Sequence, residues 1–201
     1  MRAAERAKGS LRSSPYLTLL PKSQAAGPLL IEKLSRKHKR KVGASWRMDE
    51  TYMKVKGVWK YLYRAVDKEC KTVDFLLTAH RDIATRRFFD KAMREHGAPT
   101  KIAMDKNGAD KTAIDEINSS TAVLIVVRQG KYLNNIIKQD HHAIKRVTKP
   151  MLGFKSFSAA SNVLAGIDLM HMIRKGQFAI DVVASSIADQ FYALAGTVRP
   201  V

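Results

Sequence analysis

Apolar and polar positions divide the first half of the chain into three strand-like stretches separated by short polar links. Residues 46–55 and 58–66 are rich in aromatic and branched side chains, and Lys56-Gly57 between them is a turn signal. Residues 73–78 form a third apolar stretch after the polar link at 68–72. Because both links are short, the pattern predicts an antiparallel meander of three strands.

Beyond residue 80, helical spacing of apolar residues alternates with short apolar runs. The short runs at 101–104 and 122–127 predict two further strands, the second of them buried. Gly97, Pro150 and Gly176 stand where three helices are expected to end. The helical spacing itself predicts helices over 81–96, near 111–117, over 134–148, over 156–175 and, weakly, around 187–195.

The expected order of elements is β-β-β-α-β-α-β-α-α. Three antiparallel strands followed by helix-linked strands give an α/β fold, a mixed sheet with helices on both faces. This is the element order of the ribonuclease H-like fold, which is therefore the leading candidate.

The two ends of the chain lack this regular pattern. Residues 1 to about 30 contain three prolines and show no sustained helix or strand period. Six of the nine residues at 33–41 are Lys or Arg, so this run is either a phosphate-binding arm or a solvated linker. We therefore expect an irregular basic arm at 1–44, a ribonuclease H-like domain at 45–177 and a C-terminal tail with a weak helix at 178–201.

The charge of the chain narrows the class of partner. It carries 36 Lys and Arg against 18 Asp and Glu, a formal net charge of +18. That excess favours a polyanionic partner, most simply nucleic acid. The alternatives are a basic protein without a specific partner and one that meets anionic membranes.

Cysteine usage and hydropathy exclude several other classes. Cys70 is the single cysteine, which excludes a disulfide within the chain and a cysteine-rich zinc site. No apolar run approaches the roughly 20 residues that span a bilayer. We therefore expect a cytoplasmic protein with no membrane partner.

Two aspartates occupy positions that suit metal chemistry. Asp49 lies in the middle of the first predicted strand, and Asp105 ends the fourth. In a ribonuclease H-like sheet these strands are neighbours, so the two carboxylates would converge at one edge, as a two-metal phosphoryl-transfer site requires. The alternative is that Asp49 is simply exposed and Asp105 simply caps the following helix or turn.

Several ordered blocks resemble the insertion-sequence-six family of DDE transposases. WRMDETYMKVKG at 46–57, followed by 61–67, resembles the family's first-aspartate block, and DKNGA at 105–109 resembles its second. RQGKYLNN at 128–135 and Asp140-His141 resemble the third block. Further similar segments are PMLGFKSF at 150–157 and MHMIRKG at 170–176, so the match runs from about residue 28 to 176.

The resemblance implies DNA transposition by metal-dependent cleavage and transfer of DNA strands. Asp49 and Asp105 match the family's first two catalytic metal ligands, which hold two Mg²⁺ (or Mn²⁺) ions. Residues 45–177 would then be the DDE catalytic domain. The implied partners are DNA, both the insertion-sequence ends and the target, and further copies of the chain in a homo-oligomer.

The chain departs from the family pattern at the third acid. The family has a glutamate after the Asn-Asn stretch, where this chain has Lys138. An ammonium beside two dications costs on the order of several kcal/mol. Asp140 is the nearest substitute metal ligand, but residues two apart on a helix point to different sides. We therefore expect a defective catalytic domain.

Two other functions remain open from the sequence. The first is a catalytically dead fragment that still binds DNA or full-length transposase. The second is an unrelated basic nucleic-acid-binding protein with the same element order, in which Asp49 and Asp105 would lie far apart.

The front of the chain also departs from the family, whose members carry a helix-turn-helix module ahead of the catalytic domain. Residues 1–27 are too short and irregular for that module, so we expect the chain to be truncated at its N-terminus.

Basic residues after the fifth predicted strand are candidates for contacts with the DNA backbone, and a solvated face is the alternative. His141 is a candidate for contacting phosphate or supporting the site. Trp59, Tyr61 and Tyr63 are expected to pack on the sheet, with a base-stacking platform as the alternative. The candidate DNA-binding residues are Lys131, Lys145, Arg146, Lys149 and Lys155.

Overall fold

The computed structural model describes residues 36–81, 83–105, 108–121, 124–130, 132–179 and 186–197. Along the chain, the strands are β1 (Ser45–Val55), β2 (Val58–Asp67), β3 (Thr72–Thr78), β4 (Lys101–Met104) and β5 (Val126–Gln129). The helices are α2 (Ala84–His96), α3 (Gly108–Ser120), α4 (Asn135–Thr148), α5 (Phe157–Arg174) and α6 (Ile187–Thr197), with short 3₁₀ turns η2 (Arg36–His38) and η3 (Lys149–Met151).

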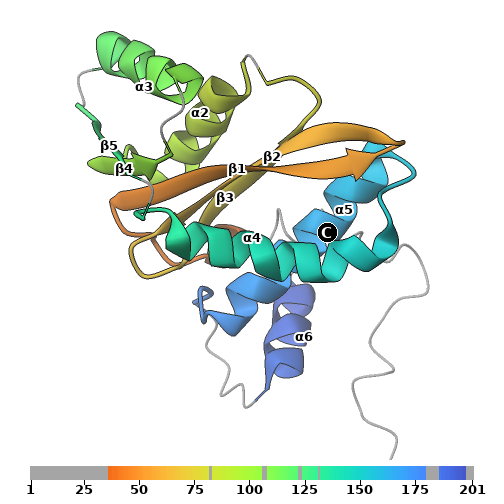
Figure 1. Cartoon of the computed structure of the whole chain (residues 1–201). Helices are drawn as coiled ribbons and strands as arrows, with labels where there is room; N and C mark the ends of the chain where they lie inside the picture. Colours follow the sequence, from red (N-terminus) through yellow and green to blue (C-terminus); the bar gives the residue numbers. More distant parts are fainter. Residues whose placement is uncertain are drawn as a thin grey trace, which may run out of the picture.

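All five strands form one mixed sheet in the order β3-β2-β1-β4-β5 (Figure 1). β1, β2 and β3 pair antiparallel, whereas β4 runs parallel to β1 and β5 runs parallel to β4. Lys56 and Gly57 between β1 and β2 both have positive φ, as a tight hairpin turn requires. This topology confirms the predicted ribonuclease H-like fold.

Helices cover both faces of the sheet, as predicted. Alternate residues of β1 point to opposite faces, so Trp46 and Met48 pack in one core with Phe88 of α2 and Ile114 of α3. Met53 and other residues of the opposite face pack in a second core with α4 and α5. In Figure 1, α2 and α3 accordingly lie on one side of the sheet, and α4 and α5 on the other.

The chain on either side of this domain also packs against it. Residues 36–44 were assigned from the sequence to a basic arm, but Arg36 forms ion pairs with Asp74 and Glu95. Lys39 forms a β-bridge with Phe178. Beyond α5, Phe178 and Leu194 of α6 pack with apolar side chains of α5 in a third small core. Part of the basic run therefore packs against the domain.

The fifth strand differs from its prediction. The sequence predicts a buried strand at 122–127, but β5 begins at Val126, and Leu124 and Val126 are exposed. Residues 122 and 123 lie outside the described residues. Among the described strands, β5 lies at the edge of the sheet and pairs with β4 alone, so an apolar run here does not imply burial on both faces.

The aromatic residues of β2 differ in burial. Tyr63 is buried beside Phe88, with 6.4 Å between the ring centroids, as sheet packing predicts. Trp59, the second residue of β2 after the hairpin turn, is 61% exposed, which contradicts that prediction.

Within the described part of the chain, no helix has the length and apolar character needed to cross a membrane.

Candidate active site

Asp49 lies in the middle of β1, opposite Arg64 of β2, on the face of the sheet that α4 covers. Its carboxylate is mostly buried. Burial raises the pKa of Asp49 to about 6, and the negative charge of Asp105 adds to this effect. The two carboxylates are therefore close enough to interact, as the convergence of β1 and β4 predicts.

Asp105 directly follows β4, the parallel neighbour of β1. Its Oδ2 forms an ion pair with Lys138, whose Nζ lies 3.0 Å away. Lys138 stands in the first turn of α4, and its charge also acts on Asp49, where it lowers the pKa against the larger effect of burial. The position at which the family pattern has an acid thus presents an ammonium to both aspartates.

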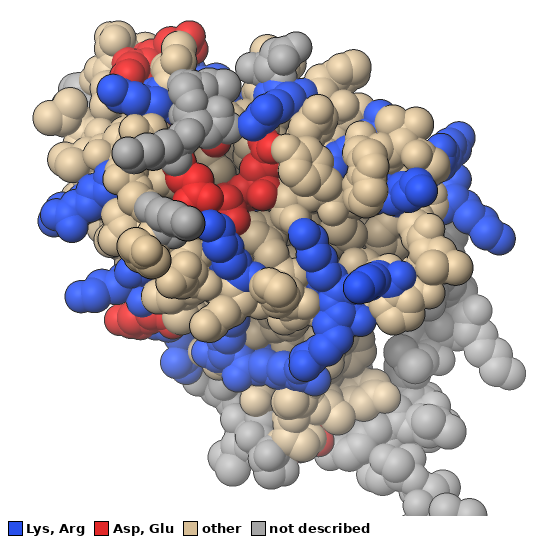
Figure 2. Space-filling model, in the orientation of Figure 1, with Lys and Arg blue, Asp and Glu red and all other residues tan. Residues whose placement is uncertain are grey.

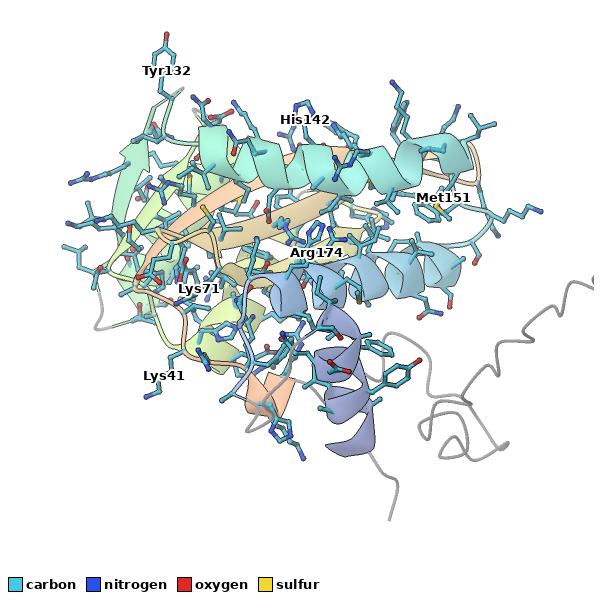
Figure 3. The ribbon with its side chains drawn as sticks, turned by 90° about the horizontal axis from the view of Figure 1, so that it is seen from below. Lys41, Lys71, Tyr132, His142, Met151 and Arg174 are labelled. Carbon is cyan, nitrogen blue, oxygen red and sulfur yellow. The ribbon has the colours of Figure 1, made fainter. Side chains whose placement is uncertain are left out.

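His141, one turn further along α4, faces Asp49 as well. Its Nε2 lies 3.7 Å from Asp49 Oδ2, and the ring is buried. Burial lowers the pKa of His141 to about 3, assisted by the charges of Arg64 and Lys145. The imidazole is therefore neutral at physiological pH and contacts Asp49 without forming an ion pair. His142 is exposed and points outward from α4, as expected for adjacent helical residues (Figure 3).

Asp140 is held elsewhere, by a buried network of charges. Its carboxylate pairs with Arg64 at 3.0 Å and with Lys175 at 2.9 Å. Arg64 also pairs with Asp168 of α5 at 2.5 Å. Burial alone would raise the pKa of Asp140, but Arg64 and Lys175 outweigh it and hold that pKa below its ordinary value. The carboxylate of Asp140 is therefore engaged by two protein cations, and its role as a substitute metal ligand stays a prediction.

Sequence reasoning missed Arg64 and Asp168. Arg64 is flanked by apolar residues in β2. A charged residue in such a strand is a sequence signal that indicates a buried partner of opposite charge. Its partners on α4 and α5 are distant in the sequence and could not be identified from it.

Glu50, the nearest other acid on β1, is also committed elsewhere. It accepts hydrogen bonds from the hydroxyls of Tyr52 and Tyr63 and pairs with Arg81 at 3.1 Å. Because neighbouring strand residues point to opposite faces, Glu50 cannot replace the missing acid beside Asp49.

The residues present do not fit a two-metal centre. Among the described residues, no group of three or more His, Cys, Asp or Glu side chains is arranged to hold a metal ion. Two aspartates converge, but a lysine stands with them and neutralises Asp105. Such a site needs several anionic oxygens to balance two dications.

Exposed cations lie on the same face of the molecule as acidic side chains. Figure 2 shows an acidic area on this face with Lys and Arg side chains nearby. Lys145, Arg146, Lys149 and Lys155 are exposed, on α4 and just beyond it. Lys131, the remaining candidate for DNA binding, lies outside the described residues.

A mixed sheet with aspartates on β1 and directly after β4 is the arrangement expected of a DDE domain. A family model described as a DDE domain matches residues 43–177. The transposase for insertion sequence-like element IS431mec of Staphylococcus aureus is 36% identical over 155 residues, covering 76% of this chain and 67% of the relative. The chain belongs to the insertion-sequence-six family of DDE transposases.

Solved structures of lower similarity include two retroviral integrase catalytic cores. That of BIV integrase has a TM-score of 0.47 at 11% identity and covers 77% of this chain and 97% of that chain. That of HTLV-2 integrase, in complex with magnesium, has a TM-score of 0.45 at 19% identity and covers 56% of this chain and 75% of that chain.

Proposed function

We propose that this DDE domain descends from an enzyme that cuts and joins DNA strands with Mg²⁺ or Mn²⁺, and that Lys138 leaves it with little or no activity. The observation that carries the proposal is the ion pair between Lys138 Nζ and Asp105 Oδ2 at 3.0 Å. In this ion pair, the Lys138 ammonium occupies the Asp105 carboxylate that would otherwise bind a metal ion. Residues 45–177 are the proposed catalytic core.

The rest of the site supports this proposal. The charge of Asp105 acts on Asp49, and Nε2 of the neutral His141 lies 3.7 Å from Oδ2 of Asp49. The network around Arg64 fixes α4 to β2 and α5. We infer that the framework that would position a third acid is retained, and that the Lys138 side chain opposes metal binding there.

Nicking of supercoiled plasmid DNA in Mn²⁺ tests the proposal without requiring knowledge of the insertion-sequence ends. We expect wild-type protein at background and measurable nicking by Lys138→Glu. Gln139→Glu is the matched control, because it adds an acid one residue away on the exposed side of α4. The double variant Asp49→Asn/Lys138→Glu should return to background. Wild-type nicking as fast as that of Lys138→Glu would refute the proposed defect.

The second candidate function is binding without cleavage, to DNA or to full-length transposase copies. The exposed cations on and after α4 favour it, since phosphate contacts do not need the metal site. We expect the wild type to bind duplex DNA in EDTA, as measured by fluorescence anisotropy, and to assemble as a homo-oligomer in sedimentation experiments. DNA binding that requires added Mg²⁺ would contradict this second function.

A further inference from the structure

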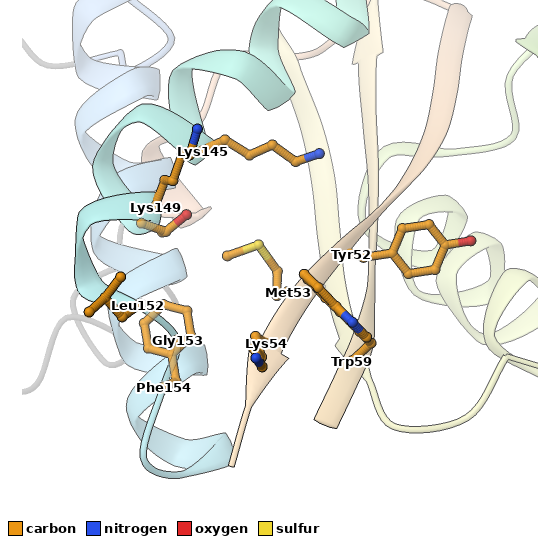
Figure 4. A pocket seen from close by; sticks show the side chains of 10 residues that line it. Tyr52, Met53, Lys54, Trp59, Lys145, Lys149, Leu152, Gly153 and Phe154 are labelled. Carbon is orange, nitrogen blue, oxygen red and sulfur yellow. The ribbon is translucent and has the colours of Figure 1, made fainter. Parts of the chain in front are cut away.

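A groove lies beside the β1–β2 hairpin, between the strands and the C-terminal end of α4 with η3. Its volume is about 720 Å³, within the range of about 300–1,000 Å³ found for ligand sites. Figure 4 shows Met53 in the space between the two sides, with Lys145 and Lys149 on the helical side and Tyr52 and Trp59 on the strand side. The remaining lining residues are Lys54, Thr148, Leu152, Gly153 and Phe154.

The floor of this groove is built into the fold. Phe154 donates its backbone N–H to the carbonyl of Lys54 at 2.8 Å, and Lys56 donates to the carbonyl of Phe154 at 2.7 Å. Gly153 has a φ of +110°, and a Cβ there would stand 3.2 Å from the carbonyl of Lys54. The segment after η3 is thus fastened to the end of β1 by two backbone hydrogen bonds.

The rim combines exposed apolar groups with positive charge. Trp59 offers an uncovered indole, and Leu152 is 91% exposed although its φ of 54° is unfavourable for a bulky side chain. Lys54, Lys145 and Lys149 are exposed around them, and no acidic residue lines the groove. Three ammonium groups beside exposed apolar groups favour an anion that also carries a flat apolar group.

We propose that the groove receives a base of an unpaired DNA strand, stacked on Trp59, with the adjoining phosphates on Lys145 and Lys149. Aromatic stacking combined with a cationic groove is how proteins bind single strands. A base within a duplex has its faces covered by its neighbours and cannot stack on Trp59. Lys145 is seven residues beyond Lys138 on the same helix, a rise of roughly 10 Å, so one DNA strand can meet both sites.

This inference rests on the proposed function only in taking DNA as the ligand. Tryptophan fluorescence tests it, because Trp59 is exposed whereas Trp46, the other tryptophan, is buried. A short oligothymidylate should quench the fluorescence of the full chain in EDTA, and a duplex of the same length should bind with little quenching. Trp59→Ala should weaken oligothymidylate binding roughly 5- to 150-fold, measured by anisotropy. Trp59→Phe should retain most of the affinity, and duplex binding should not change.

Val58→Ala is the matched control, since Val58 is the exposed neighbour of Trp59 and does not line the groove; it should bind both DNAs as the wild type does. If oligothymidylate saturates the protein without changing its fluorescence while duplex DNA still binds, base stacking in the groove would be refuted. The proposed DNA-binding function would not be affected. Equal losses of duplex and single-strand binding in Trp59→Ala would overturn base stacking in the groove as well. A wild-type chain that binds neither DNA would overturn both this inference and the proposed binding function.

Discussion

Replacing Lys138 tests whether one cation keeps divalent ions out of the site of Asp49 and Asp105. Lys138 Nζ lies 3.0 Å from Asp105 Oδ2, so an ion bound by that carboxylate would stand within a few ångströms of the ammonium. Two unit charges 4 Å apart interact by about 1 kcal/mol in bulk water and about 4 kcal/mol at an effective dielectric constant of 20. A dication doubles these values, to about 2 and 8 kcal/mol.

The exposure of the two side chains selects the lower part of this range. Lys138 and Asp105 are 41% and 43% exposed, so water screens their charges. A repulsion of roughly 2–3 kcal/mol corresponds to a factor of roughly 30 to 150 in the dissociation constant. Lys138→Gln should therefore strengthen Mn²⁺ binding by this factor. Lys138→Glu should strengthen it by a second, similar factor, because attraction replaces repulsion.

Isothermal titration calorimetry with Mn²⁺ would measure both steps. Gln139→Glu again serves as the control for a general increase in acidity, and Asp49→Asn/Lys138→Glu should lose most of the gain. Wild-type protein that binds Mn²⁺ as tightly as Lys138→Glu would contradict a repulsion by Lys138. A gain in Gln139→Glu as large as that in Lys138→Glu would contradict it equally, since the effect would then be unspecific.

Three further predictions concern stability and DNA binding. Replacing Arg64 by Leu leaves the buried Asp168 without the cation it pairs with and leaves Asp140 with Lys175 alone. Urea unfolding followed by circular dichroism should therefore show a loss of about 3–5 kcal/mol in stability, and a loss below about 1 kcal/mol would contradict the role of the network. The pKa of Asp49 is about 6 in the folded state, above its ordinary 3.8, so its contribution to stability is full below pH 3.8 and is lost as the pH rises through 6. Asp49→Asn in metal-free buffer should then be more stable than the wild type by up to about 3 kcal/mol at pH 8 and equal near pH 3, whereas a pH-independent difference would contradict the assignment. The double variant Lys145→Gln/Arg146→Gln should flatten the salt dependence of duplex binding by about 2 in log–log slope, with exposed Lys111→Gln as the control and an unchanged slope as the contrary result.

The meander could be predicted from the sequence because its signals are local. Lys56-Gly57 marks a hairpin turn by composition, and in the structure both residues have the positive φ that such a turn needs. The apolar run before Gln129 carries the same local signal as a buried strand, but its exposure depends on its place at the sheet edge. Which strand lies at the edge is decided by the pairing of distant segments, which local composition does not report.

The candidate site was predictable to the extent that it rests on the ends of neighbouring strands. Asp49 and Asp105 come together because β1 and β4 are parallel neighbours, a relation that the element order contains. The assignment of Asp140 depended instead on which partners it meets, and its cations come from β2 and from the residue after α5. Trp59 shows the same limit, since its exposure of 61% depends on the packing of distant segments, which local composition does not report.

The buried network around Arg64 has a genetic consequence. It holds α4 through Asp140, two residues beyond position 138, so the placement of that position does not depend on the side chain it carries. Codons for glutamate and lysine differ in their first base alone. A single base substitution in the gene would therefore place the acid of the family pattern into a framework that is already folded around it, which makes the change at 138 reversible by ordinary mutation.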